Sequence, residues 1–212
     1  MDGPDRRERL SRSLLYLVLE ARPHGEDPSA ILDAALRGGV DIVQLRDKEL
    51  CDEALVAASG PFRAACDVRG ALFVLNDRPD LVEACGADGV HVGRSDASVA
   101  EARQVVGPDR LIGISVSTTG ELEVVEGADY AGVTAFATPT KEDAVAGGLE
   151  LVRAAAAKLA MPWFAIGGID LSNVAEVVSA GAPGVAVVRA VRDADDSEAA
   201  ARMLRDALDR QE

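Results

Sequence analysis

Short runs of apolar residues recur along the chain at nearly even spacing. Each run is rich in Val, Ile and Leu, and its apolar positions are nearly continuous rather than alternating with polar ones. Runs of this kind are typical of strands that are buried on both faces, as in a parallel sheet. The pattern predicts strands at 14–19, 42–45, 71–75, 89–92, 111–116, 130–133, 163–166 and 184–188.

The stretches between these runs are rich in Ala, Glu and Arg, and their apolar residues recur at helical spacing. In 28–36, for example, Ile31, Leu32, Ala35 and Leu36 form one apolar stripe, and a Gly-Gly pair follows as a helix stop. The same spacing predicts helices at 52–66, 97–105, 149–159, 173–180 and 197–209, and only short helical segments at 79–85 and 119–126.

Strands and helices that alternate in this way predict an α/β fold. Eight such pairs in a chain of 212 residues favour a single closed (β/α)8 barrel, the TIM-barrel arrangement. A doubly wound open sheet is the alternative, although it more often has fewer strands. Because no linker or shift in composition divides the chain, we expect one domain over 1–212. Residues 1–12 would form a flexible or partly helical N-terminal extension.

Composition limits the partners that this chain can take. The formal net charge is −14, and the aromatic residues are only four Phe, two Tyr and one Trp. Both facts argue against a broad basic surface or stacking platforms for nucleic acid, so no nucleic-acid partner is expected. A local basic pocket for an anionic small molecule remains compatible with an acidic protein.

The cysteines and the first apolar run bear on the compartment. Cys51, Cys66 and Cys85 are odd in number and widely spaced, which argues against a disulfide scaffold or a thiolate zinc site. The run at 14–19 stops at Glu20 and is too short for a signal peptide core or a membrane span. We therefore expect a cytoplasmic protein with no membrane partner, and leave self-association into a homo-oligomer open.

Polar residues follow the predicted strands, at the end of a barrel where active sites lie. They include cations, hydroxyls, two carboxylates and a Gly-Gly turn, which together suit a phosphate or diphosphate ligand. Two carboxylates from neighbouring strands suit one Mg²⁺, completed by ligand oxygens and water. These residues are Gln44, Arg46, Lys48, Asn76, Asp77, Asp96, Ser115, Thr138, Thr140, Lys141, Gly167, Gly168, Val188 and Arg189.

Each of these candidates also has an ordinary structural interpretation. Arg46 and Lys48 could be solvated loop charges. Asp77 and Asp96 could form turns or cap the helices that follow them. The threonines and the glycine pair are common turn residues, and His91, inside a predicted strand, is more often a packed side chain than a catalytic one.

Six short phrases occur in order around this predicted rim. They are Val-Gln-Leu-Arg-Asp-Lys at 43–48, Asn-Asp-Arg at 76–78, Gly-Ala-Asp-Gly-Val-His-Val-Gly at 86–93, Gly-Ile-Ser at 113–115, Thr-Pro-Thr-Lys at 138–141 and Ala-Ile-Gly-Gly-Ile at 165–169. In this order the chain, from about residue 14 to 191, resembles the thiamine phosphate synthase family.

The resemblance implies a transferase of thiamine biosynthesis. Such an enzyme condenses 4-amino-2-methyl-5-hydroxymethylpyrimidine diphosphate with thiazole phosphate, or its carboxylated tautomer, to thiamine phosphate and releases diphosphate. In the family the diphosphate is thought to leave first, and the thiazole nitrogen captures the resulting cation. Heterolysis of this kind needs Mg²⁺ and cations around the departing diphosphate but no strong base.

The resemblance also implies roles for individual residues. The residues that would bind the pyrimidine diphosphate are Gln44, Arg46, Lys48, Asn76, Ser115 and Lys141. Of these, Arg46, Lys48, Ser115 and Lys141 would be catalytic. The resemblance makes Asp77 and Asp96 the Mg²⁺ ligands. On the thiazole phosphate it places Thr138, Thr140, Gly168, Val188 and Arg189.

Three departures from the family pattern concern mainly the thiazole side. Arg189 stands where Ser is usual, Arg94 stands where Gln is usual, and the stretch 133–138 is one residue shorter. We expect Arg189 to replace the missing Ser as a phosphate ligand; the alternative is an outward side chain paired with Asp193 or Asp195.

Two other functions remain open. A thiazole tautomerase-like relative shares the barrel but uses a histidine two residues after the Ser of the strand-five phrase, where this chain has Ser117. A non-catalytic barrel that binds a phosphorylated ligand is the other possibility, and only turnover distinguishes it.

Overall fold

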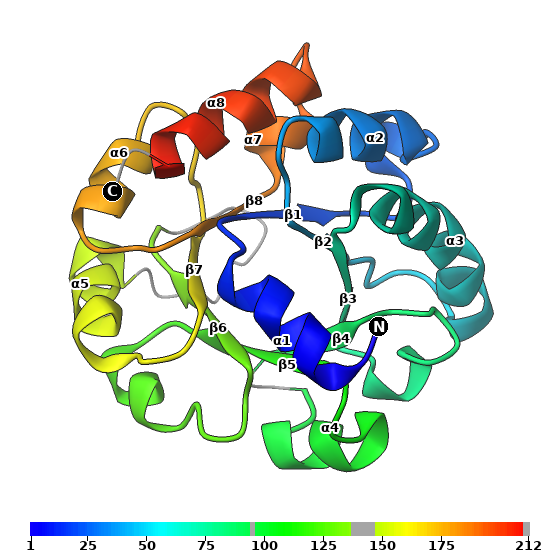
Figure 1. The fold of residues 1–212 in the computed structure, drawn as a ribbon, viewed down its shortest axis with the longest axis horizontal. Helices are drawn as coiled ribbons and strands as arrows, with labels where there is room; N and C mark the ends of the chain where they lie inside the picture. Colours follow the sequence, from blue (N-terminus) through cyan, green and yellow to red (C-terminus); the bar gives the residue numbers. More distant parts are fainter. Residues whose placement is uncertain (94–95, 137–146, 210–212) are drawn as a thin grey trace.

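Eight parallel strands close into a barrel in the computed structural model, which describes residues 1–93, 96–136 and 147–209. Each strand pairs with its neighbours in chain order, and β8 closes the ring by pairing with β1 (Figure 1). The predicted (β/α)8 barrel is thus confirmed, and the open-sheet alternative is wrong. The strands are β1 (Leu15–Leu19), β2 (Ile42–Leu45), β3 (Leu72–Asn76), β4 (Gly89–Val92), β5 (Leu111–Val116), β6 (Tyr130–Thr134), β7 (Trp163–Ile166) and β8 (Val185–Val187).

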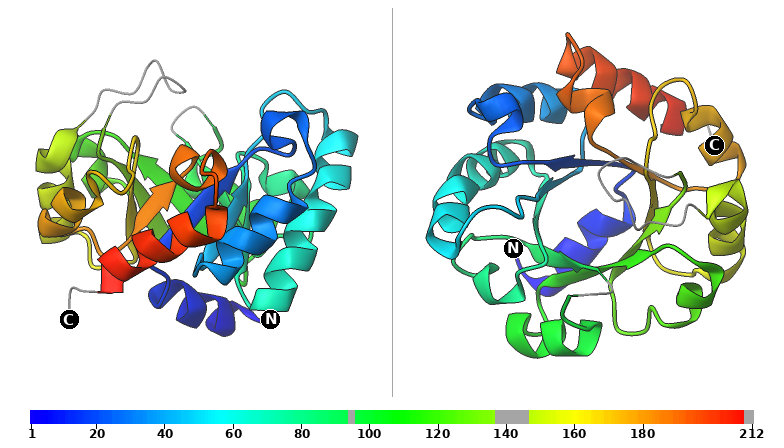
Figure 2. Two further views of the ribbon diagram at one scale, coloured as in Figure 1. Left: turned by 90° about the horizontal axis from the view of Figure 1, so that it is seen from above. Right: turned by 180° about the vertical axis from the view of Figure 1, so that it is seen from behind.

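Helices surround the barrel (Figures 1 and 2). They are α1 (Gly3–Ser11), α2 (Ser29–Arg37), α3 (Asp52–Arg69), α4 (Val99–Val106), α5 (Gly148–Lys158), α6 (Val174–Ser179), α7 (Arg189–Arg192) and α8 (Ser197–Asp209). The short segments expected at 79–85 and 119–126 contain only 3-10 turns, η2 (Pro79–Leu81) and η3 (Thr119–Glu123), and η1 (Pro23–Gly25) is a third. Among the described residues, no helix is long and apolar enough to cross a membrane.

The interior of the barrel is filled by a second apolar cluster, separate from the layer between strands and helices. Aromatic rings dominate it: Phe164 meets Tyr16 edge to face at 5.4 Å and Tyr130 at 6.0 Å between ring centroids. These inward side chains come from alternate positions of the strands, as the two-residue period of a strand requires. The barrel is therefore packed at this level, and only its mouth is available for a ligand.

Helix α1 lies across the amino ends of the strands (Figure 2). Leu10 of this helix is 1 % exposed and packs into the interior cluster. The Arg6 Nε donates to Asp88 Oδ1 at 3.0 Å, and the Arg7 Nε donates to Asp129 Oδ1 at 2.7 Å. The helix closes the end of the barrel opposite the polar rim, so the rim is the open end.

Candidate active site

The carboxyl ends of the strands bring most of the predicted rim residues together. Gln44 is buried in β2, Asn76 ends β3 and Ser115 lies in β5. Arg46 follows β2 half-buried, with its backbone N–H donating to Leu19 O at 2.9 Å. The expected roles of Thr138, Thr140 and Lys141, and the departure at Arg94, lie outside the described residues.

Two carboxylates and an ammonium meet at the ends of β3 and β4. The Lys48 Nζ lies 3.1 Å from Asp77 Oδ2, and the Asp77 carboxyl lies close enough to Asp96 to raise the pKa of that carboxyl. The Lys48 side chain is 52 % exposed, whereas that of Asp77 is 19 % exposed. The structure thus brings Lys48, Asp77 and Asp96, which are distant in the sequence, into one cluster at the rim.

The backbone around the two carboxylates explains their positions. Asp77 has a left-handed backbone with φ of 61°, and its N–H donates to His91 O at 2.8 Å. Asp96 accepts a hydrogen bond from the Gly93 N–H at 2.8 Å. A tight turn on each strand end therefore turns the carboxylates toward each other.

The ordinary interpretation of these aspartates, as helix caps, does not hold. Ser98 caps α4, in a capping box with Glu101, so Asp96 is not the cap. Residue Arg78, which precedes η2, gives no side-chain cap, and its guanidinium pairs with Asp52 and Asp80 instead. Asp77 and Asp96 face each other rather than a helix terminus.

Ionisation of Asp96 is disfavoured at this place. Burial raises the pKa of Asp96, and the neighbouring Asp77 carboxyl raises it further, against the lowering effect of the Gly93 N–H. Two carboxylates so close together gain from a cation between or beside them. Within the described residues, no group of three or more His, Cys, Asp and Glu side chains is arranged to hold a metal. A metal at this rim would therefore take two protein carboxylates and complete its shell with ligand oxygens and water.

A chain of hydrogen bonds runs through the barrel below this cluster. The Gln44 Nε2 donates to Tyr16 Oη at 2.7 Å, and Tyr16 Oη lies 3.0 Å from Tyr130 Oη. His91 Nδ1 lies 3.3 Å from Tyr130 Oη, and its Nε2 lies 3.0 Å from Ser115 Oγ. The structure therefore links two predicted site residues, Gln44 and Ser115, through three side chains that the sequence analysis did not select.

Of the residues expected to contact thiazole phosphate, the structure describes the glycine turn at 167–168 and the start of α7. Gly167 and Gly168 have φ of 105° and 58°, and a Cβ on Gly167 would lie 2.3 Å from Phe136 O. Glycine is therefore required at 167 for the close approach of two backbone segments. The Asn173 Nδ2 donates to Gly168 O at 2.8 Å, which braces the turn.

Arg189 is the first residue of α7 and is exposed, after a half-buried Val188. Its charge contributes to a lowered pKa of Asp170, where the hydrogen bond from Ser172 is the larger cause. Among the described residues, Arg189 forms no ion pair with Asp193 or Asp195, and Asp193 pairs with Arg192 and His24. The outward pairing considered as the alternative is therefore not the arrangement in the structure.

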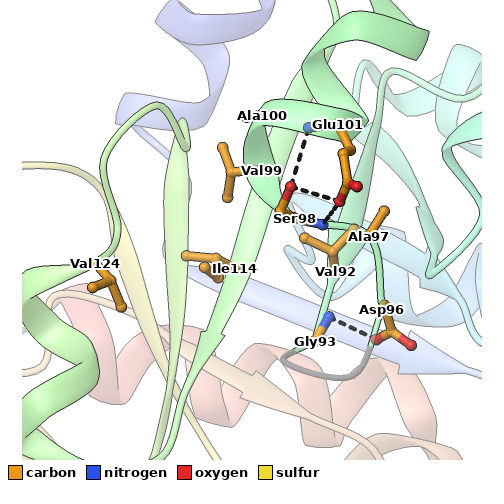
Figure 3. Close-up of a pocket in the computed structure, with 10 residues that line it drawn as sticks. All are labelled: Val92, Gly93, Asp96, Ala97, Ser98, Val99, Ala100, Glu101, Ile114 and Val124. Carbon is orange, nitrogen blue, oxygen red and sulfur yellow. Dashed lines mark hydrogen bonds between the residues drawn. The ribbon is translucent and has the colours of Figure 1, made fainter.

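A hollow of ≈ 370 Å³ lies beside the barrel mouth rather than over it. Figure 3 shows it between Ile114 of β5, Val124 and the first turn of α4, with Asp96 at one end. Apart from Asp96, the candidate residues do not line it. The chemistry expected from the sequence therefore centres on the mouth of the barrel.

Comparisons with known proteins show the family to which this chain belongs. The family described as thiamine monophosphate synthase matches residues 15–191, which span every strand of the barrel. The chain belongs to the thiamine monophosphate synthase family. It is similar to a thiamine-phosphate synthase of Thermobifida fusca, with 46 % identity over 94 % of each chain.

The chain is also similar to a longer curated protein and to a solved structure. A thiamine-phosphate synthase of a Nostoc species is 43 % identical over 98 % of this chain but over only 59 % of its own length. The chain thus spans about three fifths of that curated relative. A solved thiamine phosphate pyrophosphorylase from Pyrococcus furiosus superposes with a TM-score of 0.85 and 33 % identity, covering 96 % of this chain and 98 % of the other.

Proposed function

We propose that this chain is a thiamine phosphate synthase. It would join the pyrimidine diphosphate to thiazole phosphate and release diphosphate; with the carboxylated tautomer as substrate, the carboxyl group would also leave as carbon dioxide. The observation that carries the proposal is the meeting of Lys48, Asp77 and Asp96 at the open end of a barrel that belongs to this family. A diphosphate needs cations and a divalent metal at one place, and this cluster has one ammonium and two carboxylates that would hold the metal.

Asp77 and Asp96 fit a Mg²⁺ ion, since Mg²⁺ in phosphate-transfer sites takes one or two carboxylates and keeps ligand oxygens and water. When bound, Mg²⁺ would stabilise the negative charge that develops on the departing diphosphate. The half-buried Arg46 and the flexible Lys48 approach the same region from the end of β2, and Lys141 would complete the cationic set. These side chains bind the diphosphate and favour breakage of its bond to carbon.

The bond changes need no protein base. The C–O bond to the diphosphate breaks with its electron pair passing to oxygen, and the lone pair of the thiazole nitrogen forms the new C–N bond. Gln44, Asn76 and Ser115 would hold the pyrimidine diphosphate, since they lie at the carboxyl ends of β2, β3 and β5. The thiazole phosphate would bind the Gly167-Gly168 turn, Thr138, Thr140, Val188 and Arg189.

The tautomerase alternative lacks its catalytic group here. Ser117 stands at the place of the histidine, and its Oγ lies 3.1 Å from Thr134 Oγ1. A hydroxyl held by another hydroxyl offers no base for moving a proton at neutral pH. A barrel that binds the ligand without turnover is distinguished from a synthase by assaying product formation.

We also propose a cytoplasmic location for the chain, since Cys66 and Cys85 are buried free thiols. Assembly into a homo-oligomer is compatible with this proposal.

The metal assignment is tested by substituting the two carboxylates. Asparagine is preferable to alanine at 77, because it tolerates the left-handed backbone there. We expect Asp77→Asn and Asp96→Asn to fold normally, to bind Mg²⁺ weakly and to lose most turnover.

The matched control is Asp80→Asn, which changes a carboxylate on the same loop that pairs with Arg78 instead. Thiamine phosphate formation, Mg²⁺ titration and circular dichroism are the measurements. Wild-type rates in the presence of excess chelator would show that the carboxylates hold no essential metal.

A further inference from the structure

The hydrogen bonds inside the barrel form one continuous line from Gln44 to Ser115. Their order is Gln44, Tyr16, Tyr130, His91 and Ser115, with separations between 2.7 and 3.3 Å. Tyr16 and Tyr130 are 2 % and 0 % exposed, and Gln44 is 4 % exposed. The line starts in a dry interior and ends at the mouth, where Ser115 lies.

Donors and acceptors along this line can be assigned in turn. Tyr16 Oη accepts from the Gln44 amide, so its own proton is available for Tyr130 Oη. Burial raises the pKa of both phenols, so both keep their protons. Tyr130 Oη then accepts from Tyr16 and donates to His91 Nδ1. A neutral imidazole that accepts at Nδ1 carries its proton at Nε2.

The last bond of the line therefore has a direction. His91 Nε2–H donates to Ser115 Oγ, across 3.0 Å. A serine hydroxyl that accepts from histidine keeps its single proton for another partner. That proton is then available at the mouth of the barrel for an acceptor on the ligand.

We propose that His91 is a positioning residue that, held by Tyr130, fixes the Ser115 hydroxyl as a hydrogen-bond donor to an anionic oxygen of the ligand. The inference rests on the proposed function where it names a diphosphate oxygen as that acceptor. The direction of the bonds within the protein does not depend on the reaction. Ser115 thus contributes a preorganised donor where negative charge grows as the diphosphate leaves.

The surrounding backbone is shaped for these two rings. A Cβ on Gly113 would lie 2.1 Å from Tyr130 Cζ and 2.6 Å from His91 Nδ1, and a Cβ on Gly132 would lie 3.2 Å from His91 Cε1. Glycines on β5 and β6 thus leave the space that the imidazole and the phenol occupy. A side chain at 113 would displace one of the two rings, whereas at 132 it would only crowd the imidazole.

The tautomer of His91 is the first test, and it needs no substrate. The chain has two histidines, and the other, His24, is exposed in a loop. In a His24→Asn background, ¹⁵N-detected NMR of the imidazole therefore reports on His91 alone. We expect a proton on Nε2 and none on Nδ1. A proton on Nδ1, alone or together with one on Nε2, would overturn the inference.

A double-mutant cycle is the second test, because it separates positioning from general packing. We expect Tyr130→Phe to lower kcat about tenfold, with the KM for thiazole phosphate close to wild type, and to change kcat less than about twofold in a Ser115→Ala background. Phe164→Leu, which alters interior packing without removing a hydrogen bond, should reduce kcat by the same factor in both backgrounds. Equal losses for Tyr130→Phe in both backgrounds would contradict a role through Ser115.

The two tests fail separately. If the wild-type chain forms no thiamine phosphate, the proposed function fails and the NMR result alone decides the hydrogen-bond direction. If Tyr130→Phe does not fold, the tautomer of the His24→Asn protein still decides it. A turnover with no dependence on Ser115 would overturn the ligand contact.

Discussion

At the scale of single residues, Lys48 shows how one side chain can serve both a carboxylate and a ligand. Its ammonium pairs with Asp77 while half of the side chain remains exposed at the mouth of the barrel. A flexible stem and three donors would allow the ammonium to reach a diphosphate while it stays close to Asp77.

Loss of the Lys48 charge should therefore affect one substrate more than the other. A charge-assisted contact contributes about 1.5–3 kcal/mol. Lys48→Ala should therefore lower kcat/KM for pyrimidine diphosphate by about ten- to a hundredfold. The KM for thiazole phosphate should stay close to wild type. Steady-state kinetics with each substrate varied in turn measures both, and Lys158→Ala, which removes a surface partner of Glu123, is the control. Equal damage to both substrates would contradict this division of roles.

Arg189 should act on the opposite side of the mouth. A guanidinium reaches farther than the serine hydroxyl it replaces and offers two parallel donors to a phosphate. Arg189→Ser should weaken thiazole phosphate binding by about tenfold, or about 1.4 kcal/mol, in a calorimetric titration. Arg202→Ser, on the surface of α8 and paired with Glu198, should bind normally. Unchanged or tighter binding in Arg189→Ser would exclude a phosphate contact.

The sequence reveals charged residues that follow strands, but not polar residues that lie inside them. Lys48, Asp77 and Asp96 were predictable because charged groups directly after buried strands must lie at one end of a barrel. His91 and Tyr130 were not, since each lies within an apolar run and a single strand does not reveal its neighbours across the barrel. A signal was present in Gly113 and Gly132, two strand glycines whose missing side chains make room for those rings.

At the scale of elements, Asp41, Asp88 and Asp129 each stand just before a strand, two residues after a glycine. These aspartates were not interpreted from the sequence. The Asp41 carboxylate accepts from the Leu14 and Leu15 N–H groups, and Asp129 accepts from the Ile112 N–H. Each aspartate also pairs with an arginine from a surrounding helix, so it joins a strand end to the helical layer.

Asp88 is the most buried of these aspartates and should matter most for stability. It accepts from the Phe73 N–H at 3.0 Å, Arg6 at 3.0 Å and Arg63 at 2.8 Å. Removing one partner of a buried pair leaves a buried charge, so Asp88→Asn should cost about 3–5 kcal/mol of unfolding free energy. Asp67→Asn, which removes the exposed partner of the same Arg63, should cost less than about 1 kcal/mol. Urea unfolding near neutral pH measures both, and equal costs would contradict the assignment.

The Asp88 contribution should also depend on pH in a defined direction. Burial disfavours the carboxylate, but the Phe73 N–H and Arg63 outweigh it, so the pKa of Asp88 lies below its ordinary value. A lowered folded-state pKa gives stability that is complete above about pH 4 and is lost as the pH falls through the folded-state value. The wild type should lose this stability on acidification, whereas Asp88→Asn should show a smaller loss over the same range.

Two elements were harder to predict than the strands. Helix α7 has four residues, Arg189–Arg192, and directly follows β8, so it is too short to show helical periodicity. Residues 1–12 were expected to form a flexible or partly helical extension, yet Leu10 and Arg6 of helix α1 are buried. Arg6 pairs with Asp88 and Arg7 with Asp129, just before β4 and β6, and no local sequence pattern reveals these distant partners.

At the scale of the whole molecule, the barrel was predictable because its strands are buried on both faces. Continuous apolar runs mark such strands almost to the residue, and all eight expected runs coincide with strands of the closed ring. Closure then places every strand's carboxyl end on one rim, while α1 covers the other end. The fold and the location of the site thus follow from periodicity, whereas the hydrogen-bond line inside the barrel depends on closure.

A thiamine phosphate synthase would bind two phosphorylated substrates at this rim and join them. The most direct measurement is to incubate the chain with pyrimidine diphosphate, thiazole phosphate and Mg²⁺, and to quantify thiamine phosphate and free diphosphate together. We expect equal amounts of thiamine phosphate and diphosphate, formed only when both substrates and the metal are present. Failure to form thiamine phosphate under these conditions, or conversion of the thiazole tautomer alone, would contradict this function.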